Sequence, residues 1–115
     1  MRKWAYLREP YPYQDELVHK VMLYQTEIGG TYVFLYNSRG TQISFADEWY
    51  EDFDTALERW DALVIPNKWE EIDDPMDGCQ HDCFLPIRIK GRDIGNPQWG
   101  CYEQYDNGNW IEYKE

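Results

Sequence analysis

The chain has 115 residues, of which 43% are hydrophobic and 17% aromatic, and its formal net charge is −11. This length fits one domain, residues 1–115, and the aromatic content excludes a disordered chain, because disordered segments are poor in aromatic residues. The negative charge disfavours nucleic-acid binding and association with anionic membranes, since both repel an acidic surface. No apolar run approaches the roughly 20 residues of a membrane helix, and no apolar signal-peptide core follows the N-terminus. We therefore expect a cytoplasmic protein.

The first half of the sequence predicts an antiparallel meander. Segments rich in Val, Leu, Tyr and Phe predict strands at residues 4–8, 17–26, 31–37 and 41–45. Pro10 and Pro12 are expected to end the first strand, because proline cannot donate to a strand ladder. Gly29-Gly30 is a hairpin signal between the second and third strands. A turn at residues 37–40 then leads to the fourth strand.

One amphipathic helix follows the meander. Its apolar residues recur at helical spacing and predict a single buried stripe, made of Phe53, Ala56, Leu57, Trp60, Leu63 and Val64. Asp52 or Asp54 can cap the N-terminus of this helix, where a carboxylate also meets the positive end of the helix dipole. Pro66 stops the helix. Trp49 continues the stripe backwards, so a start near Asp47 and a start near Asp52 both remain open.

The last third of the chain predicts short strands separated by polar loops. The expected strands are residues 69–72, 85–90, 100–105 and 110–113. The sequence Asp106-Asn107-Gly108-Asn109 is a strong hairpin signal between the last two. The loops at 73–83 and 91–100 are long for so small a domain, and such loops often carry function. Together these elements predict one α+β domain, with a mostly antiparallel sheet of about five to seven strands packed against one main helix.

The excess negative charge is concentrated in one region. Between Asp47 and Asp77 the chain has twelve acidic residues and two basic ones. Such a segment either keeps the protein soluble or attracts a basic partner. Tyr and Trp favour contact surfaces, because they bury a large area at low entropic cost. The residues that we expect at a partner-binding surface are Asp47, Glu48, Glu51, Glu58, Asp61 and Trp99.

A second hypothesis concerns the segment Cys79-Gln80-His81-Asp82-Cys83. Thiolate and imidazole groups are zinc ligands, and Cys79, His81 and Cys83 would share one side of an extended segment. The spacing is unusual for a zinc site, and Cys101 is the candidate fourth ligand, with His19 or an aspartate as alternatives. The alternative is structural: without an export signal the thiols are expected to be reduced, and free cysteines are among the most buried residue types.

Catalytic motifs are not evident in the sequence, and we name no catalytic residue. A nucleophilic Cys79 or Cys83 with His81 as its base would still need an orienting group, and acidic neighbours raise the pKa of a thiol. No phosphate-binding glycine pattern or nucleophile elbow is present. Arg88 and Lys90 alternate with Ile87 and Ile89, so we expect the cations to pair with carboxylates across the sheet rather than to form a nucleic-acid surface.

The C-terminal third resembles a pattern in a family of small acidic bacterial proteins that have no named function. The segments that carry the resemblance are Asp74-Pro75, Asp77-Gly78-Cys79-Gln80-His81-Asp82, Pro86-Ile87-Arg88-Ile89-Lys90-Gly91-Arg92 and Asn96-Pro97-Gln98-Trp99-Gly100. The resemblance implies a bacterial origin and no particular activity. In size, charge and aromatic content the chain is also similar to bacterial immunity proteins and antitoxins, which is a likeness of composition and not of motif.

These observations lead to three functional expectations. The first is a non-catalytic protein-binding or regulatory module without a cofactor, in its sharpest form an immunity or inhibitor protein whose carboxylates occupy the basic cleft of an unidentified partner. The alternative is a zinc-binding protein or metal-dependent enzyme that uses the loop of Cys79, His81 and Cys83. The third is a homo-oligomer whose acidic face serves only solubility.

Overall fold

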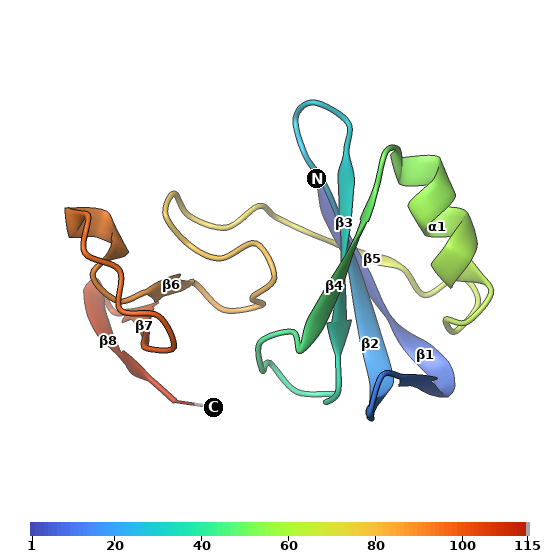
Figure 1. Cartoon of the computed structure of the whole chain (residues 1–115), viewed down its shortest axis with the longest axis horizontal. Coiled ribbons are helices and arrows are strands. Elements are labelled where there is room, and N and C mark those ends of the chain that lie inside the picture. Colours follow the sequence, from blue (N-terminus) through green and yellow to red (C-terminus); the bar gives the residue numbers. More distant parts are fainter. Residues whose placement is uncertain (115) are drawn as a thin grey trace.

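The described residues, 1–114, form two antiparallel sheets and one α-helix in a computed structural model (Figure 1). The elements in chain order are β1 (Arg2–Tyr13), β2 (Glu16–Gln25), β3 (Thr31–Tyr36), β4 (Ala46–Tyr50), α1 (Phe53–Asp61), β5 (Glu70–Ile72), β6 (Ile87–Ile89), the 3-10 turn η1 (Arg92–Ile94), β7 (Tyr102–Asp106) and β8 (Asn109–Tyr113). Five strands form one sheet in the order β4-β3-β2-β1-β5, and three form a second sheet in the order β6-β7-β8. The predicted α+β class is confirmed, and the sheet behind the helix has five strands.

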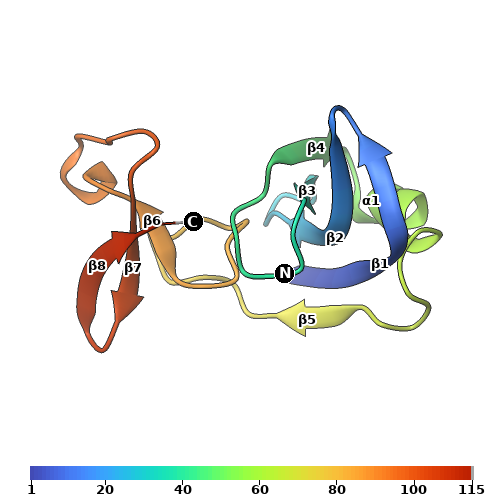
Figure 2. The same ribbon diagram turned by 90° about the horizontal axis from the view of Figure 1, so that it is seen from below.

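Side chains alternate along the strands of the five-stranded sheet, which therefore has two different faces. The first face is buried against α1 and includes Ala5, Val21, Leu23, Val33 and Leu35. The second face carries Arg2, Trp4, Lys20, Met22, Tyr24, Tyr32, Phe34 and Tyr36. Helix α1 lies on one side of this sheet, and the three-stranded sheet lies on the other (Figure 2).

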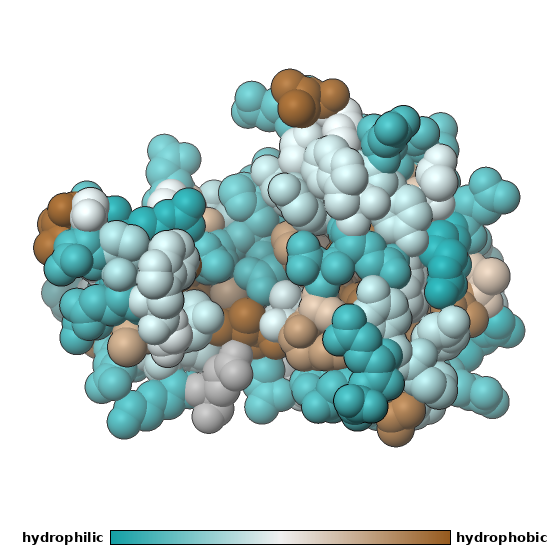
Figure 3. Space-filling model, viewed as in Figure 1, coloured by the Kyte–Doolittle hydropathy of each residue, from teal (hydrophilic) through white to brown (hydrophobic). Residues whose placement is uncertain are grey.

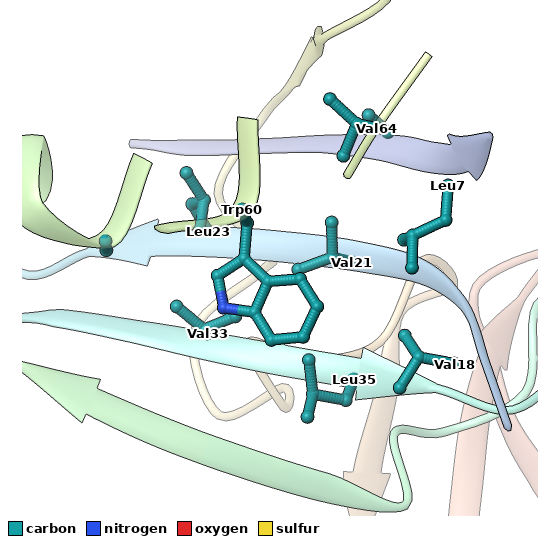
Figure 4. Close-up of a cluster of buried hydrophobic side chains, with 10 residues drawn as sticks. Leu7, Val18, Val21, Leu23, Val33, Leu35, Trp60 and Val64 are labelled. Carbon is teal, nitrogen blue, oxygen red and sulfur yellow. The ribbon is translucent and has the colours of Figure 1, made fainter. Parts of the chain in front are cut away.

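Helix α1 packs on the first face mainly through Trp60. Trp60 is fully buried and lies among side chains from the first three strands, with Val64 just beyond the helix (Figure 4). Asp52 is the N-cap, because its carboxylate accepts a hydrogen bond of 2.7 Å from the backbone N–H of Thr55. The helix thus begins after Asp52, and Trp49, which matches the helical spacing, lies in β4.

Two strand predictions are wrong in position. Strand β1 continues through both prolines to Tyr13, because its pairing with β2 shifts register between Tyr6 and Tyr11 and this irregularity accommodates them. The strand expected at residues 41–45 is absent, and residues 46–50 pair with β3 instead. Segment 41–45 runs into β4 as a loop, with one backbone hydrogen bond from Phe45 to Leu35.

The last three strands form a separate sheet, a division that the sequence analysis does not predict. The β7–β8 turn has Asn107 and Gly108 at positive φ, as the hairpin signal requires. Ile87 and Ile89 are buried, whereas Arg88 between them pairs with Glu103 across the sheet at 3.1 Å, as expected. In the space-filling view the surface dips between the two sheets, and hydrophobic atoms line the dip (Figure 3).

Candidate aromatic binding groove

The loop between β5 and β6, residues 73–86, crosses the second face of the five-stranded sheet, and Arg2 holds it there. Arg2 is 3% exposed. Its Nη1 donates hydrogen bonds to the carbonyl oxygens of His81 at 2.8 Å and Cys83 at 2.9 Å, and its Nε donates to that of Asp73 at 3.0 Å. Burial disfavours the charged guanidinium and lowers its pKa. The hydrogen bonds to loop carbonyls offset this cost, because they replace the water that the buried donors have lost. The second residue of the chain therefore fixes the path of a loop some seventy residues away.

Lys20 closes the adjoining part of the second face. Its ammonium donates to the carbonyl oxygen of Gly40 and lies 3.9 Å from the ring centroid of Phe84, 5.0 Å from that of Tyr36 and 5.9 Å from that of Trp4. The Phe84 ring makes angles of 89° with Trp4 and 59° with Tyr36. Burial, and secondarily a nearby arginine, lowers the pKa of Lys20 to about 8. The lysine thus sits in a cage of differently oriented rings.

The rest of the second face, over β2, β3 and β4, is an aromatic surface. Tyr24 and Tyr32 are directly paired across the strands, and Phe34 follows on the same strand. The ring centroids of these residues are 5.9 to 6.5 Å apart and their planes lie within 12° of parallel. Trp49, 52% exposed, meets Tyr32 edge-on at 4.8 Å. Its ring lies so close to the backbone of Gly30 that a Cβ there would be 1.9 Å from Cη2.

His81 brings the loop against this surface. Its imidazole stacks on Tyr24 with centroids 4.2 Å apart and planes 14° from parallel. Partial burial and the charge of Arg2 lower the pKa of His81 and so favour the neutral imidazole. The space between the rings and the loop is a groove of about 430 Å³, which we call the aromatic groove. It is lined by Tyr24, Tyr32, Phe34, Ser44, Asp47, Gln80, His81, Asp82 and Arg92.

Two carboxylates and one guanidinium border the aromatic groove. Asp82 accepts a hydrogen bond of 2.6 Å from the hydroxyl of Ser44. Asp47 is exposed, and within residues 1–114 neither aspartate forms an ion pair. Arg92 donates to the side-chain oxygen of Gln80 at 3.0 Å. The groove therefore combines aromatic rings with carboxylates that have no cationic partner in the described part of the chain.

The four predicted zinc ligands are placed differently from one another. Cys79 and Cys83 are buried, Cys101 is exposed, and His81 stacks on an aromatic ring. Burial raises the pKa of Cys79, and burial together with Asp82 raises that of Cys83 still further. No group of three His, Cys, Asp or Glu side chains suited to a metal ion occurs among residues 1–114. The zinc site stays a prediction that this arrangement does not favour.

Of the acidic residues predicted to meet a partner, Asp47 borders the aromatic groove and its neighbour Glu48 does not. The Glu48 carboxylate points to the α1 side of the sheet. It accepts hydrogen bonds from the Tyr13 hydroxyl at 3.1 Å, the Tyr50 hydroxyl at 2.8 Å and Trp60 Nε1 at 3.0 Å. Glu48 is thus committed to contacts within the protein.

The other predicted partner residues are spread over the molecule. Glu51 and Glu58 are exposed, near and on α1. Asp61, also on α1, accepts a hydrogen bond of 2.9 Å from Trp69 Nε1. Trp99 is 74% exposed and precedes β7 in the three-stranded sheet. The set does not form one continuous surface.

The sequence analysis did not single out Tyr24, Tyr32 or Phe34. Their signal was present, because Tyr32 and Phe34 alternate with the buried Thr31, Val33 and Leu35. The pattern shows that they share a face but not that this face is left partly uncovered.

No protein-family model matches the chain, and searches of curated proteins and of solved structures give no match either. The bacterial resemblance of the C-terminal third accordingly finds no support there. No helix within residues 1–114 is long and apolar enough to cross a membrane. The fold and the site define an α+β protein with an aromatic groove on one face of its larger sheet, and its function has to be inferred from that groove.

Proposed function

We propose that this chain is a non-catalytic module that binds a protein partner with a basic surface through the aromatic groove. The observation that carries the proposal is the combination found there. Partly exposed aromatic rings lie beside Asp47 and Asp82, which have no ion-pair partner within residues 1–114, in a chain of net charge −11. Tyr and Trp are enriched at protein interfaces, and complementary charge steers such encounters.

The chemistry of the groove supports binding over catalysis. A catalytic site needs a nucleophile or base whose pKa is shifted toward its task. The pKa values of the nearby thiols are shifted against this task, because burial raises those of Cys79 and Cys83 and so disfavours the nucleophilic thiolate. The hydroxyl of Ser44 donates to Asp82 rather than to a histidine.

The charge distribution supports a protein partner over a nucleic acid. Aromatic platforms also bind single-stranded nucleic acids, but they do so within positively charged grooves that follow the phosphates. Here Arg92 is the one Lys or Arg side chain among the residues that line the groove. An immunity or inhibitor protein, which blocks a basic cleft of its target, is the role that this charge fits best.

The proposal is tested by capture of the partner with charge-reversed variants. The chain is immobilised, proteins retained from a bacterial lysate at low and high salt are identified by mass spectrometry, and the same is done with Asp47→Lys and Glu58→Lys. Both changes add the same charge, but Asp47 borders the groove and Glu58 lies on α1. We expect wild type and Glu58→Lys to retain a basic protein, and Asp47→Lys to lose it. High salt should weaken this retention.

Two results would contradict the proposal. One is a partner that is lost with Glu58→Lys and kept with Asp47→Lys, which would place the interface on the helix side. The other is retention that neither variant nor salt affects, which would remove the role of charge.

A further inference from the structure

The aromatic groove suits a flat cation, and we propose that it receives an arginine side chain of the partner. In this arrangement the guanidinium stacks on the rings of Tyr32 and Phe34 and pairs with the carboxylate of Asp47. The inference rests on the proposed protein-binding function and specifies the residue that is recognised. It follows from ring geometry, from contacts elsewhere in this molecule and from the position of Asp47.

Ring geometry distinguishes arginine from lysine. The ammonium of Lys20 is surrounded by rings at steep angles, 89° between Trp4 and Phe84 and 59° between Tyr36 and Phe84. A compact ammonium accepts rings from several directions, whereas a guanidinium is planar and stacks on aromatic faces. The rings of Tyr32 and Phe34 are within 3° of parallel. Their parallel planes match a flat guanidinium, and the one steep ring beside them is Trp49, which meets Tyr32 at 65°.

The molecule already uses the proposed contact inside its second sheet. The guanidinium of Arg88 lies 3.8 Å from the ring centroid of Trp110 and pairs with Glu103 at 3.1 Å. One cation thus contacts an aromatic face and a carboxylate together. The guanidinium of Arg39 likewise lies over an aromatic ring, at 4.0 Å from the centroid of Tyr6.

The groove offers the same two groups, and its one lining guanidinium, Arg92, donates to the side-chain oxygen of Gln80. Asp47 is paired with Phe34 across β3 and β4, so both side chains leave the same face of the sheet. Among residues 1–114 no Lys or Arg lies over Tyr24, Tyr32, Phe34 or Trp49. The charge balance also favours a cation, because two carboxylates, Asp47 and Asp82, line the groove against one guanidinium, Arg92.

The test is an NMR titration of the ¹⁵N- and ¹³C-labelled chain with three short glycine peptides. One contains a single arginine, one a lysine, and one citrulline, which has the shape of arginine without its charge. We expect the arginine peptide to shift the resonances of Tyr24, Tyr32, Phe34 and Trp49 and to bind about two- to five-fold more tightly than the lysine peptide. The citrulline peptide should cause no saturable shift at these residues.

Variants locate the binding. Asp47→Asn and Tyr32→Leu should each weaken the arginine peptide by about two- to five-fold, the usual range for one exposed cation–aromatic contact or ion pair. Tyr32→Phe keeps the ring and should bind as wild type does, and Glu58→Gln on α1 is the matched charge control. Asp47 is exposed, so Asp47→Asn tests the proposal even if Tyr32→Leu does not fold.

The inference is overturned if the lysine peptide binds as tightly as the arginine peptide, if the shifts map elsewhere, or if a single-stranded oligothymidine shifts the groove residues and the arginine peptide does not. The lysate capture tests the proposed function, whereas the peptides test the preference for arginine. A partner lost with Asp47→Lys, together with equal binding of the lysine and arginine peptides, would sustain the proposed function and refute the preference for arginine.

Discussion

Arg2 and Lys20 are buried cations that form no ion pair with a carboxylate within residues 1–114. A buried charge is costly unless polar groups or polarisable rings take the place of water. Arg2 donates hydrogen bonds to carbonyl oxygens of the loop. Lys20 donates to one carbonyl oxygen and lies close to three aromatic rings. Both side chains join the second face of the sheet to segments far away in sequence, and Arg2 thereby holds the loop residue His81, which lines the aromatic groove.

The pKa of Lys20 predicts a dependence of stability on pH. Burial lowers this pKa from 10.5 to about 8, so between these values the unfolded chain holds more protons than the folded one. Stability from this group is therefore lowest below pH 8 and rises with pH toward 10.5. Chemical unfolding of wild type and Lys20→Met should show the wild-type free energy of unfolding gaining about 2 kcal/mol relative to the variant between pH 7 and pH 9.5.

Taking the difference between the two proteins removes the contributions of other titrating groups. Tyr36 and Cys83 have raised pKa values, so their contribution to stability falls as the unfolded groups lose protons at alkaline pH. This loss is common to both proteins. A difference that stays constant from pH 7 to pH 9.5 would show that Lys20 titrates at its ordinary pKa.

Successive side chains of β4 point to opposite faces of the sheet and make different contacts. Glu48 points to the side of α1 and accepts three hydrogen bonds from Tyr13, Tyr50 and Trp60, so it joins β1, β4 and the helix. Asp47, one residue earlier, points to the groove. Of these adjacent acidic residues, Glu48 thus makes hydrogen bonds within the fold, and Asp47 is the one that we propose for binding.

Removal of these two carboxylates should have unequal effects. Glu48→Ala leaves three donors without their acceptor, and we expect the free energy of unfolding to fall by about 2 to 3 kcal/mol. Asp47→Ala should change it by less than about 0.5 kcal/mol, because it removes an exposed carboxylate without a partner. Urea unfolding followed by tryptophan fluorescence measures both. Equal losses would mean that Glu48 does not join the sheet to the helix.

The sequence predicted those elements whose signals are local. The apolar stripe that starts at Phe53 and the turn at Asn107-Gly108 predict the helix and the last hairpin through spacing and backbone conformation alone. The predicted end of the helix is wrong, because α1 ends at Asp61 and Val64 forms a β-bridge with Leu7 instead. The position of β4 was missed, because Trp49 matches a helical stripe and a strand equally well. Which face of β2 and β3 is covered depends on a loop held by Arg2, and no local pattern contains that contact.

For the same reason the candidate site was predicted only in part. Of the residues predicted from the acidic segment and from the loop of Cys79 to Cys83, Asp47 and His81 border the groove. Asp82, which also borders it, is not among the predicted site residues. The predicted zinc ligands Cys79, His81 and Cys83 do not form a metal-suited group among residues 1–114, because His81 stacks on Tyr24 whereas both cysteines are buried. Spacing along a chain does not determine the direction of side chains in an irregular loop.

At the scale of the whole molecule, two sheets of unequal size are joined by one loop. The larger sheet buries a core against α1 (Figure 4). Among the described residues of the smaller sheet, the buried apolar ones are Ile87 and Ile89. Less buried apolar surface means less resistance to local opening.

Hydrogen exchange should reveal this difference. We expect the backbone amides of β2 and β3 to exchange slowest, near the rate set by global unfolding, and those paired between β7 and β8 to exchange at least ten-fold faster through local opening. Exchange followed by NMR at several denaturant concentrations separates local from global opening. Identical protection in both sheets would show that they unfold as one unit.

If the aromatic groove, and not the acidic helix, meets a basic partner, the two surfaces respond differently to a reversed charge. This is measured by comparing the retention of the partner by Asp47→Lys and by Glu58→Lys at a fixed salt concentration. We expect the change at Asp47 to abolish retention and the change at Glu58 to leave most of it. Loss of the partner with Glu58→Lys and its retention with Asp47→Lys would show that the interface lies on α1 instead.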